Sequence, residues 1–367
     1  MNPNQTERIA TIISASGETP YPEERGGQAP SDWLNQCHFG DCLETMRRMP
    51  DGIAQTCVTS PPYFGLRDYG HERQIGLEET PAAFVAKLVE VFREVRRVLR
   101  DDGTLWLNLG DSYAGSWGAQ GHKTTTGVSG VQIANHPKRA SNTGSIKEDG
   151  LKPKDLMGIP WRVAFALQAD GWYLRQDIIW HKPNPMPESV QDRCTKSHEY
   201  IFLLSKSSSY YCDMDAIKEP AAKGAAGSSF HTGKTGEHQL GRASSKPRKS
   251  DSANDSAVPG ASEHSGLHRE GSEREPDERN KRSVWTVATT PYKGAHFATF
   301  PTELIEPCVL AGAPAGGVVL DPFFGSGTTG QVAQNLGRAF IGCELNPAYE
   351  ALQAERLSQM GFILEAA

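Results

Sequence analysis

The sequence predicts an α/β fold in which helices flank a mostly parallel sheet, with long loops inserted between the elements. Apolar runs of strand length alternate with segments of helical periodicity through most of the 367 residues. This alternation is typical of βα units, whose crossover helices keep successive strands parallel. Two of the strand-like runs end in motifs of unusual composition, and these motifs carry the functional interpretation.

The strand-like and helical segments follow one another in a regular order. Residues 36–50 predict a short strand, a Gly40-Asp41 turn and a short helix. The remaining predicted strands are 53–60, 104–111, 172–183, 198–207, 317–323 and 339–345, and the remaining helices are 81–100, 156–169, 301–311, a stretch after the Gly-rich turn and a final helix after Pro347.

Polar tracts divide the chain into ordered and unpacked parts. Residues 1–31 are polar and rich in Gly, Pro and Glu, which predicts a mobile N-terminal arm. The tracts at about 114–152 and 218–282 have almost no apolar periodicity, so we expect two flexible insertions. One folded domain over residues 32–367 with these two insertions accounts for the pattern.

Composition excludes several classes of protein. The seven cysteines are scattered and form no C-x-x-C pair, which argues against a disulfide framework and a zinc site. No stretch of about 18 apolar residues and no signal-peptide pattern is present, so we expect a cytoplasmic protein. The net charge of −6 does not itself indicate a nucleic-acid-binding protein, although a local basic face would suffice for one.

The first motif is a glycine-rich turn after a strand. The segment VVLDPFFGSGTTG contains Gly325 and Gly327, which permit a sharp turn and a close backbone approach to a ligand. Glu344 ends the next strand and could accept hydrogen bonds from ribose hydroxyls. The pattern also fits an NAD-binding fold or an ordinary tight turn. Asp321 disfavours NAD, because a carboxylate would repel the pyrophosphate, and favours a ligand that carries an ammonium and a sulfonium.

The second motif, Ser60-Pro61-Pro62-Tyr63, ends the strand at 53–60. Two prolines fix the backbone and leave its carbonyl oxygens as acceptors. A serine hydroxyl and an aromatic face beside them could hold a planar group that bears an NH2. Alone, the segment would more often be a proline turn with an exposed tyrosine. Its presence in one chain with the glycine-rich turn, each after an apolar strand, favours a functional role.

Together, TSPPY and DPFFGSGTTG resemble the amino-methylating DNA methyltransferases. The catalytic motif stands before the glycine-rich one, as in the permuted β group of that family, and the resemblance covers most of the ordered sequence. It implies a Rossmann-like fold, S-adenosylmethionine as cofactor, double-stranded DNA as substrate and a bacterial or phage origin. It further implies catalytic roles for Ser60, Pro61, Pro62 and Tyr63. The implied cofactor contacts are Asp41, His296, Phe297, Phe300, Pro301, Asp321, Phe323, Gly325, Gly327, Thr328 and Glu344.

The resemblance also implies a mechanism in which a base is flipped out and its exocyclic amine attacks the sulfonium methyl directly. Neither an enzyme nucleophile nor a metal is required. Methylation at ring carbon five would need a thiolate after a proline; Pro307-Cys308 offers one, but within an apolar helical run that predicts a core cysteine. Family members with Ser at the first motif position often methylate cytosine N4, and some methylate adenine N6, so both bases remain open.

Sequence-specific contacts are expected from the insertions and from the segment after Tyr63. The candidates for DNA binding are Arg67, Tyr69, Lys123, Lys138, Arg139, Lys246, Arg248 and Lys249. The family includes homodimers, and association with a restriction enzyme is open. Two alternative functions remain: a methyltransferase for RNA or a protein amide, which Ser60 disfavours, and a non-catalytic nucleic-acid-binding module, which the intact pair of motifs disfavours.

Overall fold

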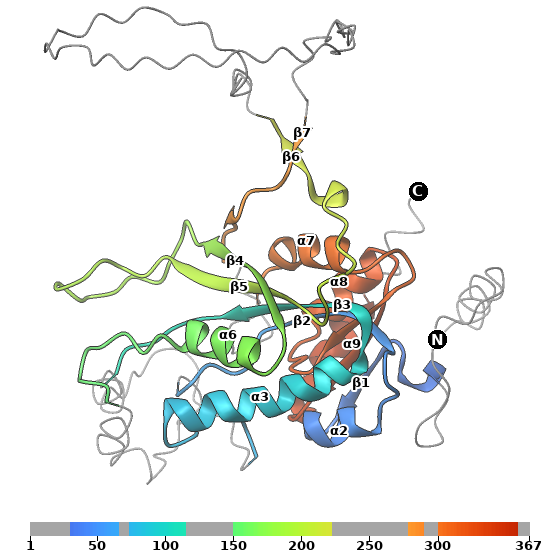
Figure 1. Ribbon diagram of the computed structural model, residues 1–367, viewed down its shortest axis with the longest axis horizontal. Helices are drawn as coiled ribbons and strands as arrows, with labels where there is room; N and C mark the ends of the chain where they lie inside the picture. The colour runs from blue at the N-terminus through green and yellow to red at the C-terminus, as the bar shows by residue number, and fades with distance from the viewer. Residues whose placement is uncertain (1–29, 66–72, 115–149, 222–277, 290–299, 359–367) are drawn as a thin grey trace, which may run out of the picture. The chain divides into compact units, whose positions relative to one another are not determined.

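The computed structural model describes residues 30–65, 73–114, 150–221, 278–289 and 300–358 (Figure 1). The chain divides into two compact units. One comprises residues 1–218 and 280–367, and the other comprises residues 219–279. The described part of the smaller unit is an antiparallel pair, β6 (Glu219–Pro220) with β7 (Glu278–Arg279). The larger unit contains both motifs.

An eight-stranded sheet forms the centre of the larger unit, in the order β1-β10-β9-β2-β3-β5-β4-β8. Its strands are β1 (Gln36–Phe39), β2 (Ala54–Thr59), β3 (Leu99–Leu109), β4 (Tyr173–His181), β5 (His198–Ser205), β8 (Val284–Thr286), β9 (Val318–Asp321) and β10 (Ala339–Glu344). The first five strands in spatial order are parallel, and β5 runs antiparallel to both of its neighbours. The predicted mostly parallel sheet is confirmed.

The helices lie at the predicted places with small differences at their ends. They are α2 (Cys42–Arg48), α3 (Pro81–Val98), α6 (Ile159–Ala169), α7 (Thr302–Gly312), α8 (Thr328–Asn335) and α9 (Glu350–Ser358), with short 3-10 helices η1 (Pro30–Trp33), η3 (Asp215–Ile217) and η4 (Pro347–Tyr349). Thr80 caps α3 by accepting from the Ala83 amide, and Pro81 occupies its first turn. None of the helices in the described ranges could span a membrane.

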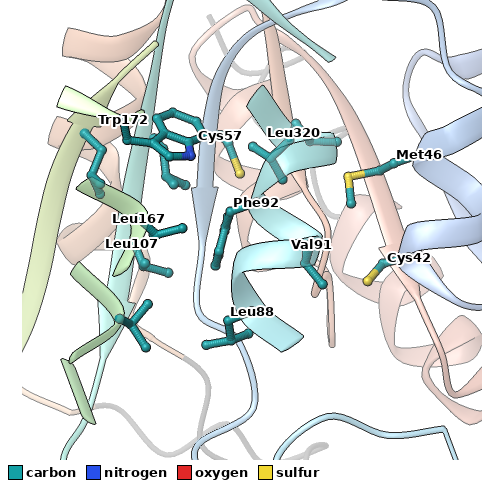
Figure 2. Close-up of a cluster of buried hydrophobic side chains, with 14 of the residues drawn as sticks. Cys42, Met46, Cys57, Leu88, Val91, Phe92, Leu107, Leu167, Trp172 and Leu320 are labelled. Carbon is teal, nitrogen blue, oxygen red and sulfur yellow. The ribbon is translucent and has the colours of Figure 1, made fainter. Parts of the chain in front are cut away.

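Two apolar layers cover opposite faces of the sheet. Side chains alternate along each strand, so Cys57 and Leu320 face one layer whereas Val58 and Val319 face the other. Helices α2, α3 and α6 cover the first face, and α7 with α8 covers the second (Figure 1). Figure 2 shows the first layer, in which side chains of α3 such as Phe92 lie against strands β2 and β3. This arrangement explains why the central strands are apolar on both sides.

The parallel strands align the two motifs along one edge of the sheet. Strands β1, β10, β9, β2 and β3 all run the same way, so their carboxyl ends share this edge. In open α/β sheets, ligands bind in the crevice outside these ends. The glycine-rich turn follows β9, and the proline segment follows the neighbouring strand β2. The fold therefore brings the two motifs together.

Candidate active site

The glycine-rich turn is held in place by polar contacts on both sides of Gly325. This residue has a φ of +51°, in the left-handed region that favours glycine. Its amide donates to the Glu344 carboxylate at 2.8 Å, and its carbonyl accepts from the Gln353 side chain at 2.7 Å. The turn is therefore fixed by the next strand and by helix α9.

The side chain of Phe324 also holds this turn, because it is buried in the core. Its ring is 3% exposed and stacks on Phe340, with ring centroids 5.2 Å apart. A Cβ built on Gly342 would lie 2.5 Å from the ring, and one built on Gly330 would lie 2.6 Å from it. Only glycine leaves room at these two positions, so Gly342 and Gly330 serve the packing of the turn.

The predicted ribose and adenine contacts lie at neighbouring strand ends. Glu344 is the last residue of β10 and is paired in register with Phe39, the last residue of β1. Asp41 follows two residues later and caps α2 by accepting from the Glu44 amide at 3.1 Å. Burial raises the pKa of Glu344, while the amides of Asn346 and Gly325 offset part of that shift.

Asp321 links the two motifs directly. Its carboxylate accepts from the hydroxyls of Thr59 and Thr329, each at 2.6 Å, and from the Phe323 amide at 3.0 Å. Thr59 is the last residue of β2 and lies 262 residues away in the chain. Burial raises the pKa of Asp321 to about 6, although the three donors act against this. Asp321 is only 2% exposed, and both of its carboxylate oxygens accept hydrogen bonds from protein groups.

The proline segment places its polar groups at the edge of the sheet. Pro61 is buried, whereas Ser60, Pro62 and Tyr63 are partly exposed. The Tyr63 hydroxyl lies 2.7 Å from Glu199 of β5 and 3.2 Å from Asn108 of β3. The sequence prediction identified neither of these two partners.

The structure describes some of the remaining predicted cofactor residues and leaves others outside its described ranges. Pro301 is buried and precedes the first residue of α7, and Phe300 packs against the second apolar layer. Thr328 is buried at the start of α8, where its hydroxyl accepts from Arg356. Phe323 is partly buried against the first layer. His296 and Phe297 lie outside the described residues.

The predicted DNA contacts also fall outside the part of the chain that the structure describes. This holds for all eight candidates, Arg67, Tyr69, Lys123, Lys138, Arg139, Lys246, Arg248 and Lys249. Residues 115–149 and 222–277 of the two expected insertions lie outside it as well.

The cysteine chemistry required for ring-carbon methylation is not available at Cys308. This residue lies inside α7 beside Pro307, is 1% exposed, and contacts the Leu304 carbonyl. Burial raises the pKa of its thiol, which disfavours the thiolate that such a mechanism would use. The prediction of a buried core cysteine is confirmed. Within the described residues, no cluster of His, Cys, Asp and Glu could hold a metal ion.

The turn after β9 fits a nucleoside that carries a cationic group. Inside the turn, the Ser326 hydroxyl is buried and has no hydrogen-bond partner among the described residues. Glu344 and Asp41 add carboxylates at adjacent strand ends, and Gly327 has a φ of +86°, in the left-handed region that favours glycine. A buried hydroxyl without a partner in the turn, together with carboxylates at the neighbouring strand ends, is the chemistry that ribose hydroxyls and a charged cofactor would satisfy.

Comparison with known proteins identifies the family. A family model described as DNA methylase, for N6 and N4 methyltransferases, matches residues 54–356. The chain is 47% identical over 320 residues to the type II methyltransferase M.XycI of Xanthomonas campestris pv. cyanopsidis, covering 87% of this chain and 86% of the relative. It is 45% identical to M.SmaI of Serratia marcescens, covering 88% and 91%.

Solved structures agree on the fold. The cytosine-N4-specific PvuII DNA methyltransferase matches with a TM-score of 0.54 at 18% identity, over 88% of this chain and 85% of that one. A Thermus thermophilus protein complexed with S-adenosyl-L-methionine matches with a TM-score of 0.50 at 23% identity, over 88% and 94%. The chain belongs to the DNA methylase family of N6 and N4 methyltransferases, and it is a DNA methyltransferase that uses S-adenosylmethionine.

Proposed function

We propose that this methyltransferase transfers the methyl group to the N4 amino group of a flipped cytosine in duplex DNA. The observation that carries the proposal is the contact of Thr59 with Asp321 at 2.6 Å, which joins the Ser60–Tyr63 segment to the glycine-rich turn. An amine held by the first motif then lies beside a methyl donor held by the second. Ser60 at the first motif position supports cytosine, by the resemblance of that position to other family members.

The residues divide the reaction between them. S-adenosylmethionine, when bound, supplies the electrophilic methyl on its sulfonium. Asp41 and Glu344 would hold its adenosine end, and the turn at Gly325 would let the backbone approach it closely. The acid Asp321 would add negative potential behind the turn. Phe300 and Pro301 at the start of α7 would line the methionine end.

The proline segment would orient the amine. Pro61 and Pro62 leave carbonyl acceptors without adding backbone donors, and the Ser60 hydroxyl adds a further acceptor. Hydrogen bonds accepted from the NH2 group draw its lone pair out of the ring and toward the methyl. Tyr63 would stack on the flipped base. After transfer the sulfonium would be left as a neutral thioether and the methylated amine would lose a proton to solvent, so no covalent enzyme intermediate would form.

Label transfer followed by nucleoside analysis tests the proposal. Tritiated S-adenosylmethionine is incubated with the enzyme and with unmodified amplified DNA, then the DNA is digested and its nucleosides are separated. We expect label in N4-methylcytosine. Label in N6-methyladenine would overturn the choice of base, and label in 5-methylcytosine would overturn direct transfer to an amine. RNA and the enzyme itself serve as parallel acceptors, and neither should be labelled.

We further propose that the two insertions in residues 32–367, at about 114–152 and 218–282, read the DNA sequence. The type II names of the relatives support a role as the modification enzyme of a restriction system, and a homodimer is a further proposal. Replacing Lys246, Arg248 and Lys249 by alanine should weaken DNA binding and reduce its salt dependence. Unchanged binding at low and high salt would contradict a role for this basic cluster.

A further inference from the structure

The catalytic tyrosine contacts a polar network that the sequence motifs do not predict. The Tyr63 hydroxyl lies 2.7 Å from Glu199 and 3.2 Å from Asn108. Asn108 also donates to the Tyr200 carbonyl at 3.1 Å and is 4% exposed. The Tyr63 hydroxyl has one proton to donate, and its shorter contact is the one to the Glu199 carboxylate. We therefore take this contact as the stronger of the two bonds. Glu199 is therefore the principal anchor of the tyrosine hydroxyl.

Glu199 is itself fixed by Lys182. The two side chains form an ion pair with 2.5 Å between Nζ and Oε1, and they are only 18% and 15% exposed. Lys182 also lies over the Trp180 ring, 4.1 Å from its centroid, and its amide donates to the Ser197 carbonyl at 2.8 Å. An ion pair with this little exposure and two further restraints on the lysine has few alternative geometries.

The tyrosine ring is restrained from a second direction. A Cβ built on Gly110 would lie 2.5 Å from the Tyr63 ring, so the ring packs directly on the backbone at the end of β3. The hydroxyl contact to Glu199 and the ring contact to Gly110 therefore define one orientation of the side chain. A stacking platform for a base must be held in this way before the base arrives.

We propose that Glu199, held by Lys182, is a positioning residue that orients the Tyr63 ring for stacking against the target base. This inference rests on the proposed role of Tyr63 in the amine transfer. Glu199 does not touch the reacting atoms; it acts through the tyrosine hydroxyl. Strand β5 is antiparallel to β3 and β4, and its register places Glu199 opposite Trp180, beside Lys182. The network thus joins the loop between β4 and β5 to the catalytic segment.

A double-mutant cycle between Tyr63 and Glu199 tests the proposal. The full-length variants Tyr63→Phe, Glu199→Ala and their combination are compared in single-turnover methyl transfer to unmodified amplified DNA. Each single variant should lower the transfer rate about tenfold, the value for loss of a hydrogen bond to a charged acceptor. The double variant should be at most about twofold slower than the slower of the two single variants, because both substitutions remove the same hydrogen bond.

Two further measurements separate positioning from a structural role. The affinity for S-adenosylmethionine should stay within about twofold of wild type in all three variants, because the contacts that carry the network join Tyr63 to Asn108, Glu199 and Lys182. Glu199→Gln keeps an acceptor for the hydroxyl and should retain transfer within about threefold of wild type. Additive losses, a wild-type rate for Glu199→Ala, or a Glu199→Gln rate as low as that of Glu199→Ala would each overturn the proposal.

The design includes controls for stability and for charge. Glu94→Ala breaks a comparable ion pair with Arg97, whose side chains are 23% and 25% exposed, on helix α3. It should leave the transfer rate unchanged. Because Glu199→Ala leaves Lys182 without its carboxylate, the cycle is repeated with Lys182→Met in every arm. A weaker coupling between Tyr63 and Glu199 is expected there, because the ion pair that fixes Glu199 is absent. Coupling as strong as with Lys182 present would show that Lys182 does not hold Glu199.

The choice of methylated base does not affect this test. If nucleoside analysis finds N6-methyladenine in place of N4-methylcytosine, the proposed base is wrong, yet the coupling of Tyr63 to Glu199 is still measured on adenine. If the base is cytosine and the losses are additive, the positioning role alone is wrong.

Discussion

The glycine-rich turn and the proline segment lie at the same edge of the sheet but are held by different kinds of contact. The backbone amide and carbonyl of Gly325 form hydrogen bonds with the side chains of Glu344 and Gln353. The proline segment, which lacks two amide donors, is fixed by the side chains at its two ends, Thr59 and Tyr63. With the roles proposed for the two motifs, we expect cofactor binding to depend on a backbone shape and transfer to depend on the orientation of side chains. Each function should therefore be separable by mutation.

The largest effect is expected from Gly325→Trp. The substitution puts a bulky side chain at a φ of +51° and into the turn where the ligand would approach. Affinity for S-adenosylmethionine should fall by more than about a hundredfold, since the side chain would occupy the space of the cofactor. Isothermal titration calorimetry measures this loss.

Gly316→Trp is the matched control for that experiment. Gly316 has a φ of +77°, and a Cβ built on it meets no atom within 4 Å. It precedes β9, at the strand end opposite to the site. Cofactor affinity should stay near the wild-type value. An equal loss in both variants would mean that strain in the fold, and not occupation of the site, lowers the affinity.

Asp321, which bonds to Thr59 and so joins the two regions, is expected to make the stability of the protein depend on pH. Asp321 has a folded-state pKa of about 6, above its ordinary value of 3.8. The folded state therefore binds the proton more tightly than the unfolded state, and this group's contribution to stability falls as pH rises from about 4 to 6. From the size of the shift, the loss is about 3 kcal/mol in total.

Urea unfolding at several pH values, with Asp321→Asn as the reference, measures this contribution. Between pH 7 and pH 4 the wild type should gain stability relative to the variant by about 3 kcal/mol. A pH-independent difference between the two proteins would show that the Asp321 carboxyl does not titrate in this range.

A smaller loss, of transfer alone, is expected from Tyr63→Ala. Removal of the ring leaves the base without its stacking partner, and misplacement of a reacting group typically costs about a hundredfold in rate. Cofactor affinity should stay within about twofold of wild type, since the ring packs on Gly110 and its hydroxyl bonds to Glu199. Single-turnover transfer and calorimetry on the same preparation provide both values. A weakened cofactor affinity would contradict the separation of the two regions.

The smallest effect is expected from Cys308→Ala. The thiol is buried in α7 and contacts the Leu304 carbonyl. Methyl transfer should remain within about twofold of wild type, with a stability loss of about 1 kcal/mol from the small cavity. A rate reduced by several orders of magnitude would instead indicate a covalent thiol mechanism.

The sequence predicts the strands and turns of both motifs because these features are local. Apolar runs ending at Thr59 and Asp321 mark strand ends, and Gly325 marks the turn. The partners of these residues are not local. The register of β5 brings Glu199 to Tyr63, and the sheet order brings Thr59 to Asp321 across 262 residues.

Element boundaries show the same limit on a smaller scale. The sequence predicts that helix α3 ends in a turn at residues 101–103, yet the helix ends at Val98 and β3 begins at the next residue. Pairing of Leu99 with Ala54 on β2 extends the strand into the expected turn. Strand β8 was also not predicted, because Val284–Thr286 is short and obtains its stability from the neighbouring β4.

The most direct test of the separation is rescue by cofactor concentration. Single-turnover transfer is measured for Gly325→Ala and Tyr63→Ala while S-adenosylmethionine is raised from the wild-type Kd to about a hundred times that value, where a tenfold weaker site still fills. We expect Gly325→Ala to approach the wild-type rate at saturation and Tyr63→Ala to stay about a hundredfold slower. Full rescue of Tyr63→Ala by cofactor would contradict the account.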